Sequence, residues 1–182
     1  AVDELKVADG KSVAKILFQL TSGTSKSRSN LAQTLQRKLQ WITFVVTSGE
    51  QSLKEKVIAD KGEWVPGMSV RFTDIDVTDV NSQVDKSLIE ATINGIQENH
   101  GVAGPAFCRE LVNEGCHLNP DLIRQRVHKA AEGLAGPDTD GSRQRAAMPL
   151  ALIKVSGELA MSFGILPQYE LSDAIDWAWQ KY

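Results

Sequence analysis

The stretch Leu-Gln-Trp-Ile-Thr-Phe-Val-Val-Thr, residues 39–47, is rich in β-branched and aromatic side chains and is almost continuously apolar. This composition is typical of a strand that is buried on both faces of a sheet. The polar residues Ser48-Gly49-Glu50 close the strand, and Ser52 with Glu55 forms a capping box for a helix that runs toward Ala59. Residues 39–47 therefore predict the central strand of an α/β fold.

Further elements of the α/β core are predicted before and after this strand in the sequence. A helix capped by Asp9 should end near Ser22-Gly23, and a polar, basic loop should follow from Thr21 to Asn30. After the turn at Pro66-Gly67, Met68 to Asp76 predicts a second, less buried strand. The inward stripe of the first helix consists of Val13, Ile16, Leu17 and Leu20.

Beyond residue 80 only helices are predicted. They span Gln83 to Asn99, Gly104 to Asn113, a segment opened by Asn119-Pro120-Asp121, Ser142 to Phe163, and a final helix that Ser172-Asp173 caps. In the first of these, Leu88, Ile89, Thr92, Ile93 and Ile96 are expected to face inward. We therefore expect an α/β core over residues 1–80 and a helical domain over residues 81–182.

Bulk composition describes an ordinary globular chain. The 182 residues carry a net charge of −3, with 24% charged and 42% hydrophobic residues, which excludes a disordered tail. No run approaches the roughly 18 apolar residues of a membrane span, and the N-terminus lacks a secretory pattern. A cytoplasmic protein without a membrane partner is expected, with Cys108 and Cys116 reduced because their spacing matches neither a disulfide framework nor a metal site.

The first residues of the sequence contain a pair of adjacent acidic residues. Ala1-Val2-Asp3-Glu4-Leu5 resembles the end of a buried strand that carries two adjacent carboxylates. In P-loop ATPases one such acid holds Mg²⁺ and the second orients the attacking water, while a Gly-rich loop cradles the phosphates. No G-x-x-x-x-G-K-[ST] loop occurs in the sequence. A solvated pair of surface charges is the alternative for Asp3 and Glu4.

The order of these blocks resembles the C-terminal half of a bacterial helicase-like family, domain of unknown function nine hundred twenty-seven, which contains superfamily II helicases and inactivated derivatives. The matching blocks are residues 2–9, 23–28, 41–50, 67–76, 100–111 and 150–160. The resemblance implies a partial AAA+/RecA-like sheet with few strands, followed by a lid-like C-terminal helical bundle. It also implies that the phosphate-binding loop lies upstream of the residues present here.

Roles for particular residues follow from this resemblance. Asp3 would hold Mg²⁺, Glu4 would polarise the hydrolytic water, and Ser48 or Thr47 would contact the γ-phosphate at the tip of the central strand. Arg145 would face the phosphates from the head of the long helix. The alternatives are a turn cap for Ser48 and a solvated helix face for Arg145. Two prolines, Pro105 and Pro149, stand where relatives carry arginine, which weakens the predicted lid.

A basic pair lies just ahead of the predicted central strand. Lys26 and Arg28 are surrounded by small residues that allow a backbone to approach a polyanion closely. In ring helicases a loop at this place points into the pore and tracks phosphates, so the pair is a candidate nucleic-acid contact. A solvated turn is the alternative.

Two functions remain open at this point. The first is the C-terminal portion of a helicase-like ATPase of a mobile element or phage, inactive in hydrolysis without the missing loop. The second is a truncated stand-alone module that binds nucleic acid or protein, or that forms a homo-oligomer through unpaired sheet edges. The family implies Mg²⁺ and ATP, but this chain alone is expected to bind neither, and DNA or a second copy is the expected partner.

Overall fold

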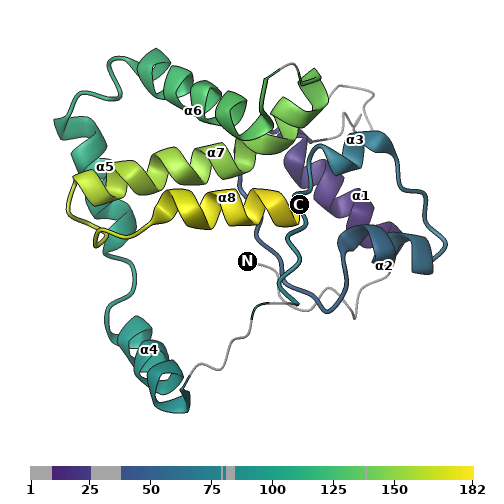
Figure 1. Cartoon of the computed structure of the whole chain (residues 1–182), viewed down its shortest axis with the longest axis horizontal. Helices are drawn as coiled ribbons and strands as arrows, with labels where there is room; N and C mark the ends of the chain where they lie inside the picture. Colours follow the sequence, from purple (N-terminus) through teal and green to yellow (C-terminus); the bar gives the residue numbers. More distant parts are fainter. Residues whose placement is uncertain (1–9, 26–37, 79, 81–84, 138) are drawn as a thin grey trace, which may run out of the picture. The chain divides into compact units, whose positions relative to one another are not determined.

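The computed structural model describes residues 10–25, 38–78, 80, 85–137 and 139–182 (Figure 1). Its helices are α1 (Gly10–Thr21), α2 (Leu53–Ala59), α3 (Pro66–Ser69), α4 (Lys86–Glu98), α5 (Ala103–Asn113), α6 (Pro120–Ala135), α7 (Gly141–Ser162) and α8 (Leu171–Lys181). Within these ranges the chain is mainly helical and contains no β-sheet.

The predicted α/β fold, with its partial AAA+/RecA-like sheet, is therefore wrong. Residues 39–47 form no named strand, and the predicted second strand from Met68 to Asp76 begins instead inside the short helix α3. Isolated pairing occurs at Thr24 with Gln40, and Thr47 also takes part in an isolated bridge. The physical reason is that high β-propensity needs a partner strand of matching register, and the described residues supply none along residues 42–46.

The chain divides into two compact units, Ala1–Asp74 and Ile75–Tyr182. Each unit contains its own cluster of buried side chains. The first unit carries more basic than acidic residues, and the second carries more acidic than basic residues.

The core of the first unit is small and lies where α1 packs on α2. Val13, Leu53 and Val57 are its buried residues, and Leu20, Val45, Trp64, Met68 and Phe72 pack around them. The predicted capping box of α2 is confirmed, because Ser52 Oγ accepts a hydrogen bond from the Glu55 amide and the Glu55 carboxylate accepts one from the Ser52 amide. These two hydrogen bonds fix the start of α2 and so place Leu53 and Val57 in the core.

The predicted first helix is largely confirmed as α1. It ends at Thr21, next to the predicted stop at Ser22-Gly23, and Val13 is buried as expected. Ile16, however, is 55% exposed, and the described α1 residues that contact the core cluster are Val13 and Leu20. The predicted cap Asp9 and the side chain of Leu17 lie outside the described part.

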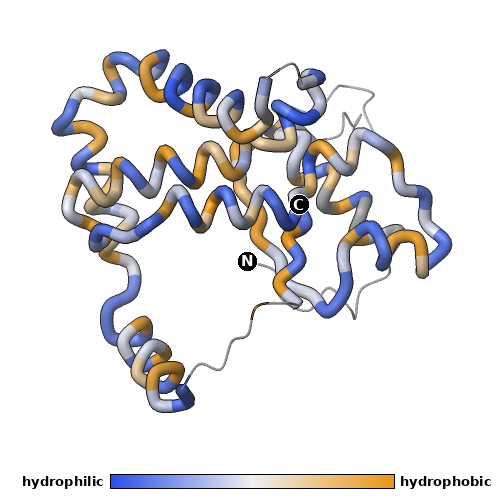
Figure 2. The backbone as a smooth tube through the Cα atoms, in the orientation of Figure 1, coloured by the Kyte–Doolittle hydropathy of each residue, from blue (hydrophilic) through white to orange (hydrophobic). Residues whose placement is uncertain are grey.

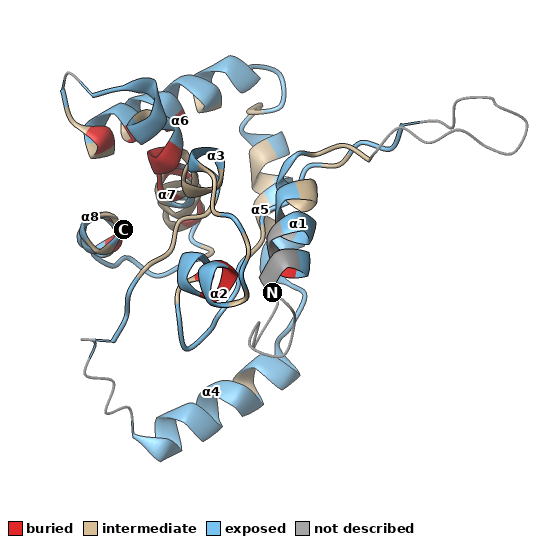
Figure 3. Cartoon of the chain, turned by 90° about the vertical axis from the view of Figure 1, so that its right-hand side faces the viewer, coloured by how far each residue is buried: buried red, intermediate tan, exposed pale blue. Residues whose placement is uncertain are grey.

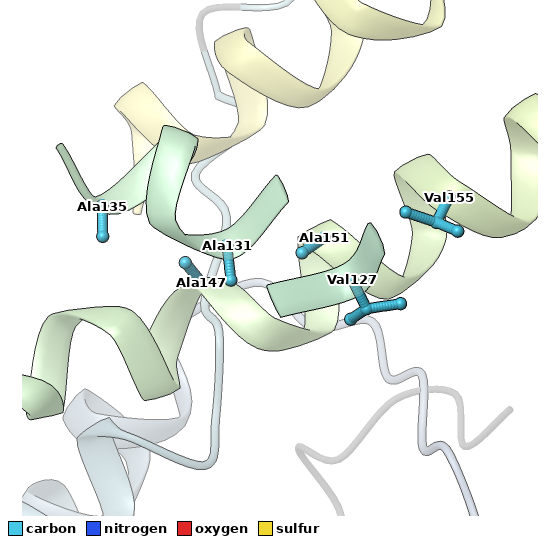
Figure 4. Packing of buried hydrophobic residues seen from close by; sticks show 6 residues of the cluster. All are labelled: Val127, Ala131, Ala135, Ala147, Ala151 and Val155. Carbon is cyan, nitrogen blue, oxygen red and sulfur yellow. The ribbon is translucent and has the colours of Figure 1, made fainter. Parts of the chain in front are cut away.

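The second unit is built on the pair α6 and α7, which pack closely along a row of small side chains. Figure 4 shows Ala131 and Ala135 of α6 with Ala147 and Ala151 of α7 between the two backbones, and Val127 and Val155 farther along. Ala131, Ala147 and Ala151 have no exposed surface. We call these six residues the alanine seam; their small side chains allow the two helices to approach closely.

The predicted starts and ends of α6 and α7 are confirmed in part. Pro120 occupies the first turn of α6 as expected, but the Asn119 side chain makes no capping hydrogen bond. The helix α7 starts at Gly141 and is capped by Asp140, whose carboxylate accepts from the amides of Ser142 and Arg143. It ends next to Gly164, which has a φ of 70°.

Helix α8 covers another side of α7. Leu150 contacts Leu171, Ile175 and Ala178 of α8 in a second buried cluster. Trp177 and Trp179 are two residues apart on α8 and so lie on different faces of the helix: Trp179 packs against the core, and Trp177 is exposed. The Arg143 guanidinium lies 5.3 Å from the centre of the Trp179 ring and joins the start of α7 to α8.

Gly157 determines how closely α8 approaches α7. A Cβ atom at Gly157 would lie 2.5 Å from Leu171 Cδ2. We expect Gly157→Ala to destabilise the protein by about 1 kcal/mol, because the overpacking cost of roughly 1–3 kcal/mol exceeds the gain in helix propensity of about 1 kcal/mol. Chemical denaturation followed by circular dichroism measures the change.

The matched control for this substitution is Gly133→Ala in α6, where an added Cβ meets nothing within 4 Å. This variant should gain up to about 1 kcal/mol, because alanine is the better helix former. Equal effects of the two substitutions would contradict the close α7–α8 contact.

Helices α4 and α5 complete the second unit. Phe107 of α5 packs on Phe163 just after α7, with ring centres 5.8 Å apart. The helix α4 is confirmed within the predicted range 83–99, but its predicted inward face is wrong. No residue of α4 is buried, and Leu88, Ile89, Ile93 and Ile96 are exposed. Figure 3 shows α4 in pale blue along most of its length, and Figure 2 shows that the same helix carries hydrophobic turns in orange.

Candidate interaction surface

Four of the predicted site residues cannot be placed. Asp3 and Glu4, predicted for metal binding and catalysis, and Lys26 and Arg28, predicted for nucleic-acid binding, lie outside the described residues. Their roles stay predictions.

The other predicted site residues lie on the surface of different units. Thr47 and Ser48 are exposed neighbours in the first unit. Arg145 is exposed on the first turns of α7 in the second unit, and its Nε donates a 2.9 Å hydrogen bond to the Gly141 carbonyl. This bond holds the Arg145 side chain along its own helix. The predicted phosphate contact of Arg145 stays a prediction.

Among the described residues, no group of three or more His, Cys, Asp or Glu side chains is arranged to hold a metal ion. No described helix is long and apolar enough to cross a membrane. One shallow hollow follows the exposed face of α6 and is lined by Asp121, Arg124, Gln125, His128, Lys129 and Glu132. Its lining comes from a single helix, and Asp121 and Arg124 form an ion pair within it, so it is the charged outer face of that helix.

One carboxylate of the first unit is partly buried. Asp74 Oδ2 accepts a 3.2 Å hydrogen bond from the Leu53 amide at the start of α2. Burial raises the pKa of the Asp74 carboxyl above its usual value, against the lowering effect of the backbone hydrogen bonds from Leu53 and Lys54. The Asp74 carboxylate is therefore partly removed from water, and its hydrogen bond connects the start of α2 to the end of the first unit.

We expect Asp74→Asn to remove a pH-dependent loss of stability. Because the folded pKa lies above the unfolded one, the contribution of Asp74 is fully present below the unfolded pKa of 3.8 and is lost as the pH rises through the folded pKa. The asparagine side chain of this variant does not titrate, and its amide oxygen can still accept from the Leu53 amide. Thermal unfolding at pH 3 and pH 7 should show the variant gaining relative to the wild type at the higher pH.

The control is Asp76→Asn, which should show the opposite trend. Hydrogen bonds from Thr78 lower the pKa of the exposed Asp76 carboxyl, so its contribution is present above the unfolded pKa and is lost as the pH falls. A Tm for Asp74→Asn that falls below that of the wild type at pH 7 would show that the charge of Asp74 stabilises α2 more than its burial destabilises it.

The strongest candidate for a functional surface is the stretch that we define as segment 38–50. Its beginning is held beside residues 22–25, as Figure 3 shows where both lead into the grey trace. The Ser25 amide donates to the Leu39 carbonyl at 2.9 Å, and the Trp41 amide donates to the Gly23 carbonyl at 2.9 Å. Gly23 permits this approach, since its φ is 68° and an added Cβ would lie 2.9 Å from the Trp41 oxygen.

Side chains anchor one face of this segment to the first unit. Trp41 Nε1 donates a 2.8 Å hydrogen bond to the Leu20 carbonyl at the end of α1. Four residues later, Val45 packs against the cluster of Val13, Leu53 and Val57. Trp41 and Val45 therefore define the inward side of the segment.

The outward side of the segment is apolar. Ile42, Phe44 and Val46 are 105%, 50% and 58% exposed. Their spacing of two residues places them in one row when the chain is extended. Residues 42–46 make no backbone hydrogen bond to another described residue. Among the described residues, the segment thus presents an apolar row together with backbone groups at 42–46 that are not paired, next to the isolated bridge at Thr47.

Sequence reasoning found this stretch but assigned it the wrong role. Its apolar character predicts burial on both faces, whereas the structure leaves one face exposed. The alternation that distinguishes the two cases was present in the sequence only weakly, because Val45 and Val46 are equally apolar.

Comparison of the chain with protein-family models, curated proteins and solved structures found no match, so the helicase-like resemblance stays a prediction.

Proposed function

We propose that the chain is a protein-interaction module that associates with itself through segment 38–50. The observation that supports this function is the exposed row of Ile42, Phe44 and Val46 on a segment whose inward side is fixed by Trp41 and Val45. Unpaired strands with apolar side chains tend to pair with other chains unless charges or bulges block them. Residues 39–48 carry no charged side chain that would do so.

Pairing with a strand of another molecule would stabilise this segment in two ways. The N–H and C=O groups of residues 42–46, which make no backbone hydrogen bond to another described residue, would gain hydrogen bonds, and part of the apolar row would be covered. A single pair of strands lies at the small end of interface sizes, below about 1,200 Å², so we expect a dissociation constant in the micromolar range.

Sedimentation velocity over a concentration series tests the proposal. The wild type should pass from monomer to dimer in the micromolar range, and Phe44→Lys should remain a monomer, because a charge in the middle of the row blocks pairing. The matched control is Ile58→Lys, which changes a similarly exposed residue of the same unit on α2 and should leave the dimer intact. A wild-type chain that stays monomeric at several hundred micromolar would refute the proposal.

The helicase-like ATPase and its DNA partner stay predictions from the resemblance alone. The described residues add no observation in favour of that function, and the sheet on which it depended is not formed among them.

A further inference from the structure

We infer that two copies of segment 38–50 pair antiparallel in the register that places Phe44 opposite Phe44 of the second copy. This inference rests on the proposed self-association and adds its geometry. It follows from three features of the segment: the direction of its backbone groups, the positions of its apolar side chains, and the charges at its two ends.

The backbone groups determine which residues can pair with a second copy. Leu39 and Trp41 direct their hydrogen bonds toward residues 23 and 25. Because successive residues of an extended chain direct these groups to opposite edges, the even-numbered residues from Gln40 onward direct theirs to the other edge. A second copy at that edge must therefore pair even residues with even residues.

The side chains select among the even registers. With Phe44 opposite itself, Ile42 lies opposite Val46 and the entire row is matched apolar to apolar. A shift that centres the pairing on Ile42 would place Lys38 opposite Val46. A shift that centres it on Val46 would place Glu50 opposite Ile42. Registers centred on Thr43 or Val45 also pair even residues, but they place Gln40 opposite Val46 or Ser48 opposite Ile42. Of these five registers, only the Phe44-centred one matches the entire row apolar to apolar.

The ends of the segment favour the same register. Lys38 and Glu50 are both exposed and stand six residues before and six residues after Phe44. In the Phe44-centred register, Lys38 of each copy therefore lies opposite Glu50 of the other. Parallel pairing in register would instead place Lys38 beside Lys38, which is unfavourable. Charge complementarity thus points to a second copy in antiparallel orientation.

Cysteine cross-linking tests the register directly in the full chain with Cys108→Ser and Cys116→Ser as background. Ile42→Cys and Val46→Cys would be mixed and oxidised under mild conditions. Directly opposed, hydrogen-bonded residues have Cα atoms about 5.5 Å apart, which a disulfide can span. In the proposed register the mixture should form a disulfide-linked dimer, and each variant alone should not, since like positions would be about 13 Å apart.

The outcomes separate the register from the proposed function. If the wild type dimerises but Ile42→Cys alone cross-links as well as the mixture does, pairing is parallel or is centred on Ile42, so the register is wrong, while self-association stands. If the wild type is monomeric, both ideas fail. A dimer in which neither the mixture nor the single variants cross-link would also overturn the register.

Exchange of the end charges provides a second test that leaves the apolar row unchanged. Lys38→Glu and Glu50→Lys should each weaken the dimer about fivefold, because like charges then face one another at both ends. The double variant should recover the wild-type dissociation constant at low ionic strength, because each end again pairs opposite charges. A double variant as weak as the single variants would contradict the pairing of Lys38 with Glu50.

Discussion

Replacing Ala151 by leucine should destabilise the second unit by about 3 kcal/mol, at the upper end of the usual cost of overpacking. Ala151 has no exposed surface and lies in the alanine seam between α6 and α7. The additional carbon atoms of a leucine cannot reach solvent at this place, so the helices must move apart and lose contacts along the whole seam. For a chain of this length, the loss corresponds to a fall in Tm of about 10 °C.

The matched control for this prediction is Ala174→Leu, which adds the same atoms to an exposed position of α8. Its effect should stay within about 0.5 kcal/mol, as is usual for surface substitutions. Urea denaturation followed by circular dichroism compares the two variants. If both variants unfolded at the wild-type midpoint, the close contact of α6 and α7 would not exist in solution.

Replacing Leu150 by alanine should have a similarly large effect through the opposite mechanism. Leu150 is 3% exposed and fills the space between α7 and α8, where it meets Leu171 and Ile175. Truncation leaves a cavity, and buried Leu→Ala substitutions cost about 2–5 kcal/mol. This is a large share of the roughly 5–15 kcal/mol that stabilises a typical domain.

The control for this truncation is Leu152→Ala, two residues farther along α7, where the leucine is exposed. Here the loss should be below about 1 kcal/mol, because less apolar surface is returned to water. Differential scanning calorimetry of the two variants gives the comparison. Equal losses for both would mean that α8 does not cover Leu150.

Signals that act within a few residues were predictable from the sequence. The capping box of Ser52 and Glu55 formed as expected, and Pro120 entered the first turn of α6. Both depend on bonds or dihedral angles inside one turn of chain. The starts of the helices of the second unit were therefore placed to within a few residues.

Features that depend on distant partners were not predictable. The β-propensity of residues 39–47 shows that the stretch suits a half-buried pleated surface, but it does not show that a partner strand exists. In the same way, the apolar periodicity of α4 identified a face without identifying anything that covers it. The candidate interaction surface was found as a sequence feature, and only the exposed fractions of Ile42, Phe44 and Val46 assigned it to the surface.

The exposure of α4 has a consequence for local opening of the chain. A helix of 13 residues that buries no side chain must persist mainly on its own hydrogen bonds, which are marginal at this length in water. The amide protons of α4 should therefore exchange with deuterated solvent long before those of α7. Because α7 contains many buried residues, its amides should exchange only when the whole second unit unfolds. A molecule that covered the apolar side chains of α4 would therefore rigidify this helix.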